Sequence, residues 1–224
     1  MRMETPRIVA FGGWAETPLW EYVFRLSGKD RPRVLVVPTA SADDPRFVVD
    51  AYERFRDRAD VSHLTFFPWP PEDLRARALG QDVIVVGGGN TANMLAIWRL
   101  HGFDRILREA WERGTVLCGG SAGAICWFEA SVTDSFGPQL EGMRDGLGFL
   151  PGSACPHYDG EELRRPRYTE LVRDGFPAGI AIDDSAAVRF DGTAIGEVLT
   201  TRDGAGAYRV SAEGEDPLDA RLLT

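Results

Sequence analysis

The 224-residue chain has the composition of an ordinary soluble globular domain, with 44% hydrophobic and 26% charged residues. Its formal net charge of −9 argues against a nucleic acid or an anionic membrane surface as partner. No apolar run approaches the roughly 20 residues of a membrane span, and the N-terminus lacks the long apolar region of a signal peptide. We therefore expect a cytoplasmic protein. Three cysteines without ligand spacing predict neither disulfides nor a metal site, and we expect no cofactor.

The first half of the chain alternates short apolar runs with amphipathic segments. Strands are predicted at residues 7–11, 33–37, 61–67, 83–86 and 116–119, and helices at 19–26, 47–55, 72–79 and 92–100. Strands that are apolar throughout and alternate with helices are typical of a parallel sheet covered on both faces. We therefore predict an α/β fold whose functional site lies beyond the carboxyl ends of the strands.

The second half of the chain has a different pattern. Residues 131–151 resemble loop with a short strand, a basic helical segment follows at 161–174, and short strands are predicted at 179–183, 186–190, 194–200 and 207–210. The sequence contains no internal repeat, low-complexity segment or convincing linker. Residues 1–224 are therefore predicted to form one domain.

A glycine-rich turn, Gly87-Gly88-Gly89-Asn90, follows the fourth predicted strand. Such turns at helix N-termini bind phosphate, but the dinucleotide pattern G-x-G-x-x-G and the P-loop pattern with its lysine are both absent, which disfavours a nucleotide. The alternative is that a glycine N–H here stabilises an oxyanion. The next strand, one helical crossover away, would bring a second glycine-rich turn to the same edge of the sheet.

That second turn lies in the segment TVLCGGSAGAICWF, residues 115–128. Its Gly119-x-Ser121-x-Gly123 pattern has the spacing of a nucleophile elbow, in which a strained strand-to-helix turn presents a serine hydroxyl. A Cβ on the flanking glycines would collide with the neighbouring strand or helix, and the N–H of Ala122 could bind a developing oxyanion. An apolar helical pattern continues to Phe128. The same pattern also occurs in turns that only connect two elements.

A serine nucleophile needs a base, and three histidines are candidates. His157 follows Pro156 in a predicted loop, where catalytic residues are often found. His63 lies within a predicted strand, and His101 follows a helix, where it would suit the C-terminal end of the helix dipole. We favour His157.

The base needs an orienting acid, and the sequence leaves more than one choice. Asp184 follows the strand predicted at 179–183 and would project at the carboxyl edge of the sheet. Asp134 lies in the loop after the elbow helix. Asp183 is also possible, because strand ends are predicted only to within a few residues. Each could instead be an ordinary turn aspartate.

Three segments carry a resemblance to a known family: GGGNTANMLAIWR from residue 87, CGGSAGAICWFEASVTDSFG from residue 118 and CPHYDGEELRRPRY from residue 155. The chain resembles the peptidase E group of the S51 serine peptidases, which are dipeptidase E-like proteins related to cyanophycinases. The similarity extends over most of the chain, from Arg7 to Val210. It implies a flavodoxin-like three-layer sandwich with a mostly parallel sheet, close to that of class I glutamine amidotransferases.

The resemblance also implies roles for single residues. The nucleophile falls on Ser121, the histidine on His157, the oxyanion donors on the backbone of Gly88 and Ala122, and the acid on Asp184, where relatives often have Glu, or on Asp134. The implied activity is hydrolysis of small peptides with an N-terminal aspartate (Asp-X) through an acyl-enzyme. The alternatives are an esterase or isoaspartyl-type peptidase on the same site and an inactive ligand-binding relative. A glutamine amidotransferase would carry cysteine in place of Ser121. A monomer and a homodimer both remain open.

A cluster of arginines follows His157 closely, at Arg164, Arg165 and Arg167. A guanidinium group binds a carboxylate through two parallel hydrogen bonds, which suits the side chain of an N-terminal aspartate. We expect Arg165 or Arg167, which flank Pro166, to bind that group. The alternative for the cluster is a solvated helix face.

Overall fold

The computed structural model describes residues 5–13 and 15–224, and two β-sheets form its frame. The first sheet contains the strands β14 (Ala220–Leu222), β11 (Ala194–Thr200), β10 (Ala186–Asp191), β1 (Arg7–Phe11), β5 (Val116–Gly120), β4 (Val83–Val86), β2 (Arg33–Val37) and β3 (Asp60–His63), in this spatial order. From β1 to β3 all neighbours are parallel, and β10 and β11 continue the sheet antiparallel on the other side of β1. The predicted parallel sheet is therefore present.

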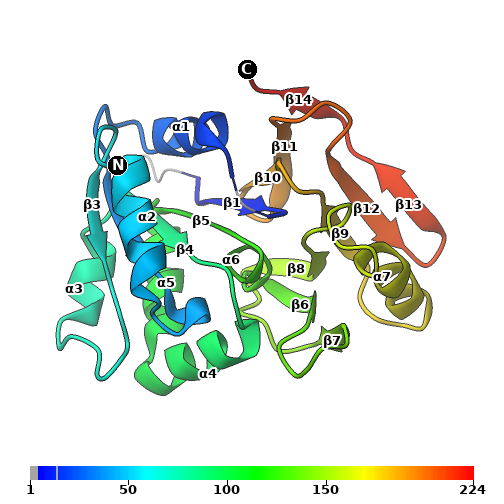
Figure 1. Cartoon of the computed structure of the whole chain (residues 1–224), viewed down its shortest axis with the longest axis horizontal. Coiled ribbons are helices and arrows are strands. Elements are labelled where there is room, and N and C mark those ends of the chain that lie inside the picture. The colour runs from blue at the N-terminus through cyan, green and yellow to red at the C-terminus, as the bar shows by residue number, and fades with distance from the viewer. Residues whose placement is uncertain (1–4, 14) are drawn as a thin grey trace.

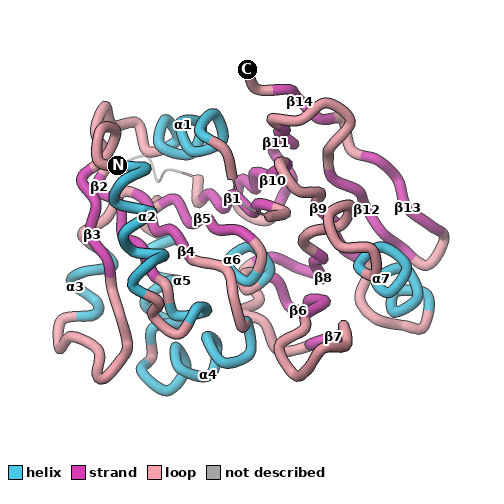
Figure 2. Tube along the Cα trace, viewed as in Figure 1, coloured by secondary structure: helices cyan, strands magenta, loops and turns pink. Residues whose placement is uncertain are grey.

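Helices cover both faces of this sheet (Figures 1 and 2). One face packs against α1 (Thr17–Leu26) and α2 (Pro45–Phe55), and the other against α3 (Leu74–Leu79), α4 (Thr91–His101), α5 (Phe103–Glu112) and α6 (Ala122–Ile125). Successive residues of a strand serve opposite faces, as the pleat requires. In β1, for example, Ile8 and Ala10 pack toward α4 and α5, whereas Val9 and Phe11 pack toward α1. The central strands β1, β2 and β4 are mostly apolar because both faces of the sheet are buried there.

The second sheet lies at the end of the molecule opposite α3 (Figure 1). Its strands are β13 (Gly214–Pro217), β12 (Ala207–Ser211), β9 (Gly179–Ile182), β8 (Leu150–Cys155), β6 (Phe128–Thr133) and β7 (Glu141–Met143), and α7 (Arg164–Arg173) packs on it. One hydrophobic cluster includes residues of both sheets, and the ring of Phe128 in β6 lies 5.6 Å from that of Phe190 in β10. The two sheets therefore share a hydrophobic core.

Two elements end earlier than the sequence predicts. The apolar pattern after Ser121 predicts a helix to Phe128, but α6 stops at Ile125 and Phe128 begins β6. A short apolar run is compatible with a helix and with a buried strand, and here Phe128 packs on Phe190 as part of a strand. The strand predicted at 61–67 ends at His63. Beyond it, the N–H groups of Phe66 and Phe67 donate to the Asp43 carboxylate at 2.5 and 2.9 Å, instead of to a neighbouring strand.

The described part of the chain contains no helix that is long and apolar enough to span a membrane. The parallel strands β1, β4 and β5 end side by side, so the turns after them form one edge of the sheet. These turns hold the glycines that follow β1 and β4 and the serine that follows β5.

The contact between α6 and β4 gives a stability prediction. A Cβ on Gly123 would overlap the backbone carbonyl of Val86, which cannot move without displacing β4. Gly→Ala inside a helix ordinarily stabilises, whereas overpacking costs about 1–3 kcal/mol. We expect Gly123→Ala to lower the free energy of unfolding by an amount in that range.

The matched control is Gly137→Ala, since the nearest atom to its added Cβ is the Gln139 Oε1 at 3.7 Å. It should change stability by less than about 0.5 kcal/mol, as other surface substitutions do. Urea unfolding followed by tryptophan fluorescence measures both variants. Equal stabilities for the two would show that the close approach of α6 to β4 is not required.

Candidate active site

Ser121 occupies the turn between β5 and α6 in a strained conformation. Its backbone has φ +55° and ψ −118°, in the region of positive φ that residues with a Cβ rarely adopt. Gly119 and Gly123 lie on either side, and a Cβ on each of them would overlap the carbonyl oxygen of Val86. The local geometry is therefore that of the elbow predicted from the sequence, with the two glycines required by the close approach of β4.

The two residues predicted to supply the oxyanion donors, Gly88 and Ala122, both lie next to Ser121. A Cβ built on Gly88 would lie 3.4 Å from Ser121 Cβ and 3.9 Å from Oγ, so the turn after β4 faces the serine directly. Ala122 is the first residue of α6, and a residue at this position has no carbonyl four residues earlier in the helix to accept from its N–H. The predicted oxyanion donors thus flank the nucleophile candidate. Their function as donors remains a prediction.

His157 lies directly after β8 and is held against the ends of two other strands. Its N–H donates to the carbonyl of Gly12 at 3.0 Å, after β1, and the N–H of Tyr158 donates to that of Ile182 at 3.1 Å, at the end of β9. The backbone of His157 has φ +51°, a second strained position at this edge. The parallel strands β8 and β9 of the second sheet therefore place the histidine at the edge of the first sheet that carries Ser121.

The other two histidines lie elsewhere. His63 Nδ1 shares a hydrogen bond of 3.1 Å with the hydroxyl of Tyr52, and the His101 ring lies 5.6 Å from that of Phe66. Neither lines the cavity that contains Ser121 and His157. The sequence-based preference for His157 agrees with this placement.

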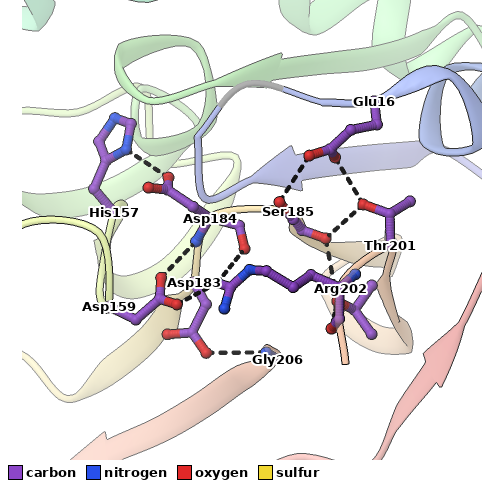
Figure 3. Close-up of polar contacts among 10 residues, drawn as sticks. Glu16, His157, Asp159, Asp183, Asp184, Ser185, Thr201, Arg202 and Gly206 are labelled. Carbon is purple, nitrogen blue, oxygen red and sulfur yellow. Dashed lines mark hydrogen bonds and ion pairs between the residues drawn. The ribbon is translucent and has the colours of Figure 1, made fainter. Parts of the chain in front are cut away.

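Of the three candidate acids, the structure brings Asp184 to the histidine. Asp184 Oδ1 lies 2.7 Å from His157 Nδ1 (Figure 3). The neighbouring Asp183 points the opposite way into the protein, where its carboxylate accepts from the N–H of Gly206 at 3.0 Å. Asp134 is exposed after β6, and no hydrogen bond or ion pair in the described ranges links it to His157.

The carboxylate of Asp184 lies between two glycines. A Cβ on Gly13 would overlap its Oδ1 and would approach His157 Cε1 to 3.1 Å, and a Cβ on Gly160 would overlap its Oδ2. The chain therefore closes around the acid from both sides at positions without side chains. This close approach places the Asp184 carboxylate beside His157.

The turn that carries Asp184 is held by polar groups that sequence reasoning did not identify (Figure 3). The Asp184 N–H donates to Asp159 Oδ1 at 2.8 Å, and the Arg202 guanidinium donates to Asp159 Oδ2 and to the Asp184 carbonyl, the latter at 3.0 Å. Asp159 lies within the segment that carries the family resemblance. Arg202 follows β11, and no pattern in the sequence connects it to this turn.

A second group of contacts holds the next residue. Ser185 has φ +65°, and its hydroxyl donates to Glu16 Oε1 at 2.7 Å, while the hydroxyl of Thr201 donates to Glu16 Oε2 at 2.7 Å. Burial raises the pKa of Glu16, but the hydrogen bonds from Thr201, Ser185 and its own backbone, together with the charge of Arg202, outweigh burial and lower the net pKa. Glu16 is therefore a carboxylate that fixes the far side of the same turn.

Ser121 and His157 line one cavity of about 280 Å³. Its other lining residues are apolar side chains and glycines: Phe11, Gly13, Ala15, Trp20, Phe47, Val85, Val86, Gly87, Gly88 and Gly120. No Asp, Glu, Lys or Arg is among the described residues that line it. We refer to this space as the Ser121 cavity.

The arginines expected to bind a substrate carboxylate do not reach this cavity. Arg165 donates to Glu215 at 3.1 Å and lies 4.9 Å from the ring of Tyr208, and Arg167 donates to the Leu140 carbonyl at 3.1 Å. Both side chains lie on α7, which packs on the second sheet, and they contact β13 and the residue before β7. Neither arginine lines the cavity that contains the serine.

The nucleophile that the site offers is a hydroxyl rather than a thiol. Cys118, Cys126 and Cys155 are buried, and burial raises the pKa of each thiol, for Cys155 to about 12. Among the described residues, no group of three or more His, Cys, Asp or Glu side chains could hold a metal ion. A serine that shares a cavity with a carboxylate-bound histidine is the arrangement used for acyl transfer.

The acid assignment is tested by three variants. We expect Asp184→Asn to slow the reaction of Ser121 with a fluorophosphonate probe by orders of magnitude, by analogy with the roughly 10⁴-fold loss in turnover for the same change in a serine-protease triad. Asp134→Asn and Asp183→Asn should label at close to the wild-type rate, because neither carboxylate contacts His157. Equal, mild effects in all three variants would leave the histidine without an acid partner.

The buried carboxylate of Asp183 gives a prediction about stability. Desolvation by burial raises its pKa above the ordinary value. A carboxyl group with a raised pKa takes up its proton at a higher pH in the folded state than in the unfolded state. The free energy of unfolding therefore increases as the pH falls from the folded-state pKa toward the unfolded-state pKa of about 3.9. We expect the free energy of unfolding of the wild type, relative to Asp183→Asn, to rise as the pH is lowered through this window. Urea unfolding of both proteins at a series of pH values measures it, and parallel curves would contradict the raised pKa.

Comparisons with known proteins show the family to which the chain belongs. The chain matches the model of peptidase family S51 over residues 13–198. It is 46% identical over 222 residues to a Bacillus subtilis (strain 168) protein named "Uncharacterized peptidase YgaJ", in an alignment that covers 95% of this chain and 96% of the relative.

Two solved structures share the fold. The crystal structure of a peptidase from an acI-B1 Actinobacterium has a TM-score of 0.73 at 16% identity and covers 100% of this chain and 99% of its own. A "Putative Peptidase E Protein" from Listeria monocytogenes EGD-e has a TM-score of 0.67 at 18% identity, and the match covers 88% of this chain and 98% of the Listeria chain. These likenesses agree with the predicted flavodoxin-like sandwich. With a family match over most of its length and a curated relative at 46% identity, the chain belongs to peptidase family S51.

Proposed function

We propose that this member of the S51 peptidases is a serine peptidase that cleaves small peptides through an acyl-enzyme on Ser121. One observation carries the proposal: Ser121 and His157 line the same cavity, and the Nδ1 of that histidine is bound to Asp184 at 2.7 Å. The membership in a peptidase family supports the reaction class. We further propose that the enzyme is cytoplasmic, needs no metal or cofactor, and acts as a monomer or homodimer.

The proposed reaction follows from how His157 is held. With Nδ1–H donating to Asp184, the Nε2 of the neutral ring carries a lone pair and can take the proton of the Ser121 hydroxyl. The serine oxygen then attacks the peptide carbonyl, and the N–H groups of Gly88 and Ala122 stabilise the oxyanion. His157 passes the proton to the departing amine, and water releases the acyl group by the same steps in reverse.

The finer specificity that we propose is for an N-terminal aspartate, as the resemblance to dipeptidase E-like proteins implies. In the present geometry this requires Arg165 to leave Glu215, or Arg167 to leave Leu140 and Glu170, if either is to bind the substrate carboxylate. A comparison of Asp-Leu, Asn-Leu and Ala-Leu hydrolysis measures the preference for the carboxylate itself.

The alternatives are another acyl-transfer hydrolase on the same residues, such as an esterase or an isoaspartyl-type peptidase, and an inactive ligand-binding relative. The strained backbone at Ser121 favours an active enzyme over the last of these, because such strain persists only where the surrounding structure maintains it. Reaction with a fluorophosphonate distinguishes an active serine from an inactive relative, and an ester and peptide panel distinguishes the reactions.

The proposal predicts that Ser121→Ala abolishes both fluorophosphonate labelling and Asp-Leu hydrolysis. His157→Ala should lose as much activity as Ser121→Ala, because members of a triad act as a unit and their effects do not add. Loss of a single oxygen at a surface turn should change the free energy of unfolding by less than about 1 kcal/mol. His63→Ala is the control and should retain activity. Full turnover in folded Ser121→Ala would falsify the nucleophile assignment.

A further inference from the structure

The Ser121 cavity has an apolar wall that the proposed reaction does not explain. Phe11 and Trp20 form one side, with ring centroids 5.0 Å apart, and both are at most 4% exposed. Phe47, on α2, is half-buried and closes the cavity beside Gly87, since a Cβ on that glycine would lie 2.9 Å from the ring. The indole N–H of Trp20 donates to the Ala15 carbonyl at 2.8 Å. The wall therefore presents carbon to any group that enters.

The chemistry of this wall selects what can bind. A carboxylate or ammonium group inside would lose water without meeting an opposite charge, because no charged side chain is among the described residues that line the cavity. An apolar side chain would instead gain by leaving water. With a volume of about 280 Å³, the cavity is suited to one side chain rather than to a long peptide.

We infer that the Ser121 cavity is the subsite for an apolar side chain carried by the second residue of the substrate, the one that leaves with the amine. The inference rests on the proposed function, in which the acyl residue is an aspartate. His157 must protonate the departing amine, and it lines the cavity. The side chain of the residue that carries this amine therefore lies next to the apolar wall. The substrate class is then Asp-X dipeptides in which X is apolar.

Turnover of a dipeptide panel tests the inference. We expect kcat/KM for Asp-Leu and Asp-Phe to exceed that for Asp-Ser and Asp-Glu by at least about tenfold, the effect typical of an apolar pocket. Equal values across the four would overturn the inference. Efficient cleavage of Leu-Ser with no preference at the second position would also overturn it, because the cavity would then hold the acyl residue.

A charge placed in the wall provides a second test. Phe47→Lys should reduce Asp-Leu hydrolysis and favour Asp-Glu, shifting the ratio of the two kcat/KM values by at least about tenfold, because a cation would then face the entering side chain. Val49→Lys is the matched control, since it adds the same charge to the same helix at a position that is 55% exposed and outside the cavity. Phe47→Ala replaces the lysine variant if that protein does not fold. It should weaken the preference for leucine over serine.

Failure of this inference can be distinguished from failure of the proposed function. Fluorophosphonate labelling of Ser121 reports on the nucleophile without any peptide specificity. Normal labelling with an unchanged ratio in Phe47→Lys overturns the apolar subsite and leaves the proposed function intact. If labelling and hydrolysis are both absent, saturation-transfer NMR with leucinamide and serinamide still tests the cavity. Stronger transfer to leucinamide, lost in Phe47→Lys, supports the subsite, and equal transfer overturns it.

Discussion

The site depends on one contact, the 2.7 Å hydrogen bond between His157 and Asp184. It joins two loops that follow different strands of the second sheet, and it forms beside the end of β1 in the first. The contact fits only because Gly13 and Gly160 leave the carboxylate room on both sides. Hydrogen bonds to a charged group typically contribute about 1.5–3 kcal/mol, but here the greater effect is geometric, since the bond fixes the orientation of the imidazole.

The surrounding fold maintains several strained residues at this edge. Ser121, His157 and Ser185 all have positive φ, at a typical cost of about 1–3 kcal/mol for each such residue. Packing of α6 on β4 supports the first of them, and strand-end carbonyls and the Glu16 carboxylate hold the other two. The pair of Asp159 and Arg202 is partly exposed, so it contributes more to the position of the Asp184 turn than to stability.

The sequence by itself determined the α/β frame and the local chemistry of the serine turn. Strands that are apolar along their length require a sheet with two covered faces, so the α/β frame could be predicted. The spacing of Gly119, Ser121 and Gly123 reflects steric crowding within one turn, so the serine turn could be predicted as well. The preference for His157 over the other histidines followed from its place in a loop and from the family resemblance. It agrees with where the fold puts that residue, beside Ser121.

Only the tertiary structure decided which acid meets the histidine and what surrounds the serine. Asp183 and Asp184 differ by one position, and the direction of each side chain depends on how β9 ends against residues far away in the chain. The same holds for Arg165 and Arg167, whose direction is set by the packing of α7 on the second sheet. The apolar cavity is assembled from β1, α1, α2 and β4, elements that are distant in sequence. Long-range packing leaves no local signal in the sequence, so these features could not be predicted from it.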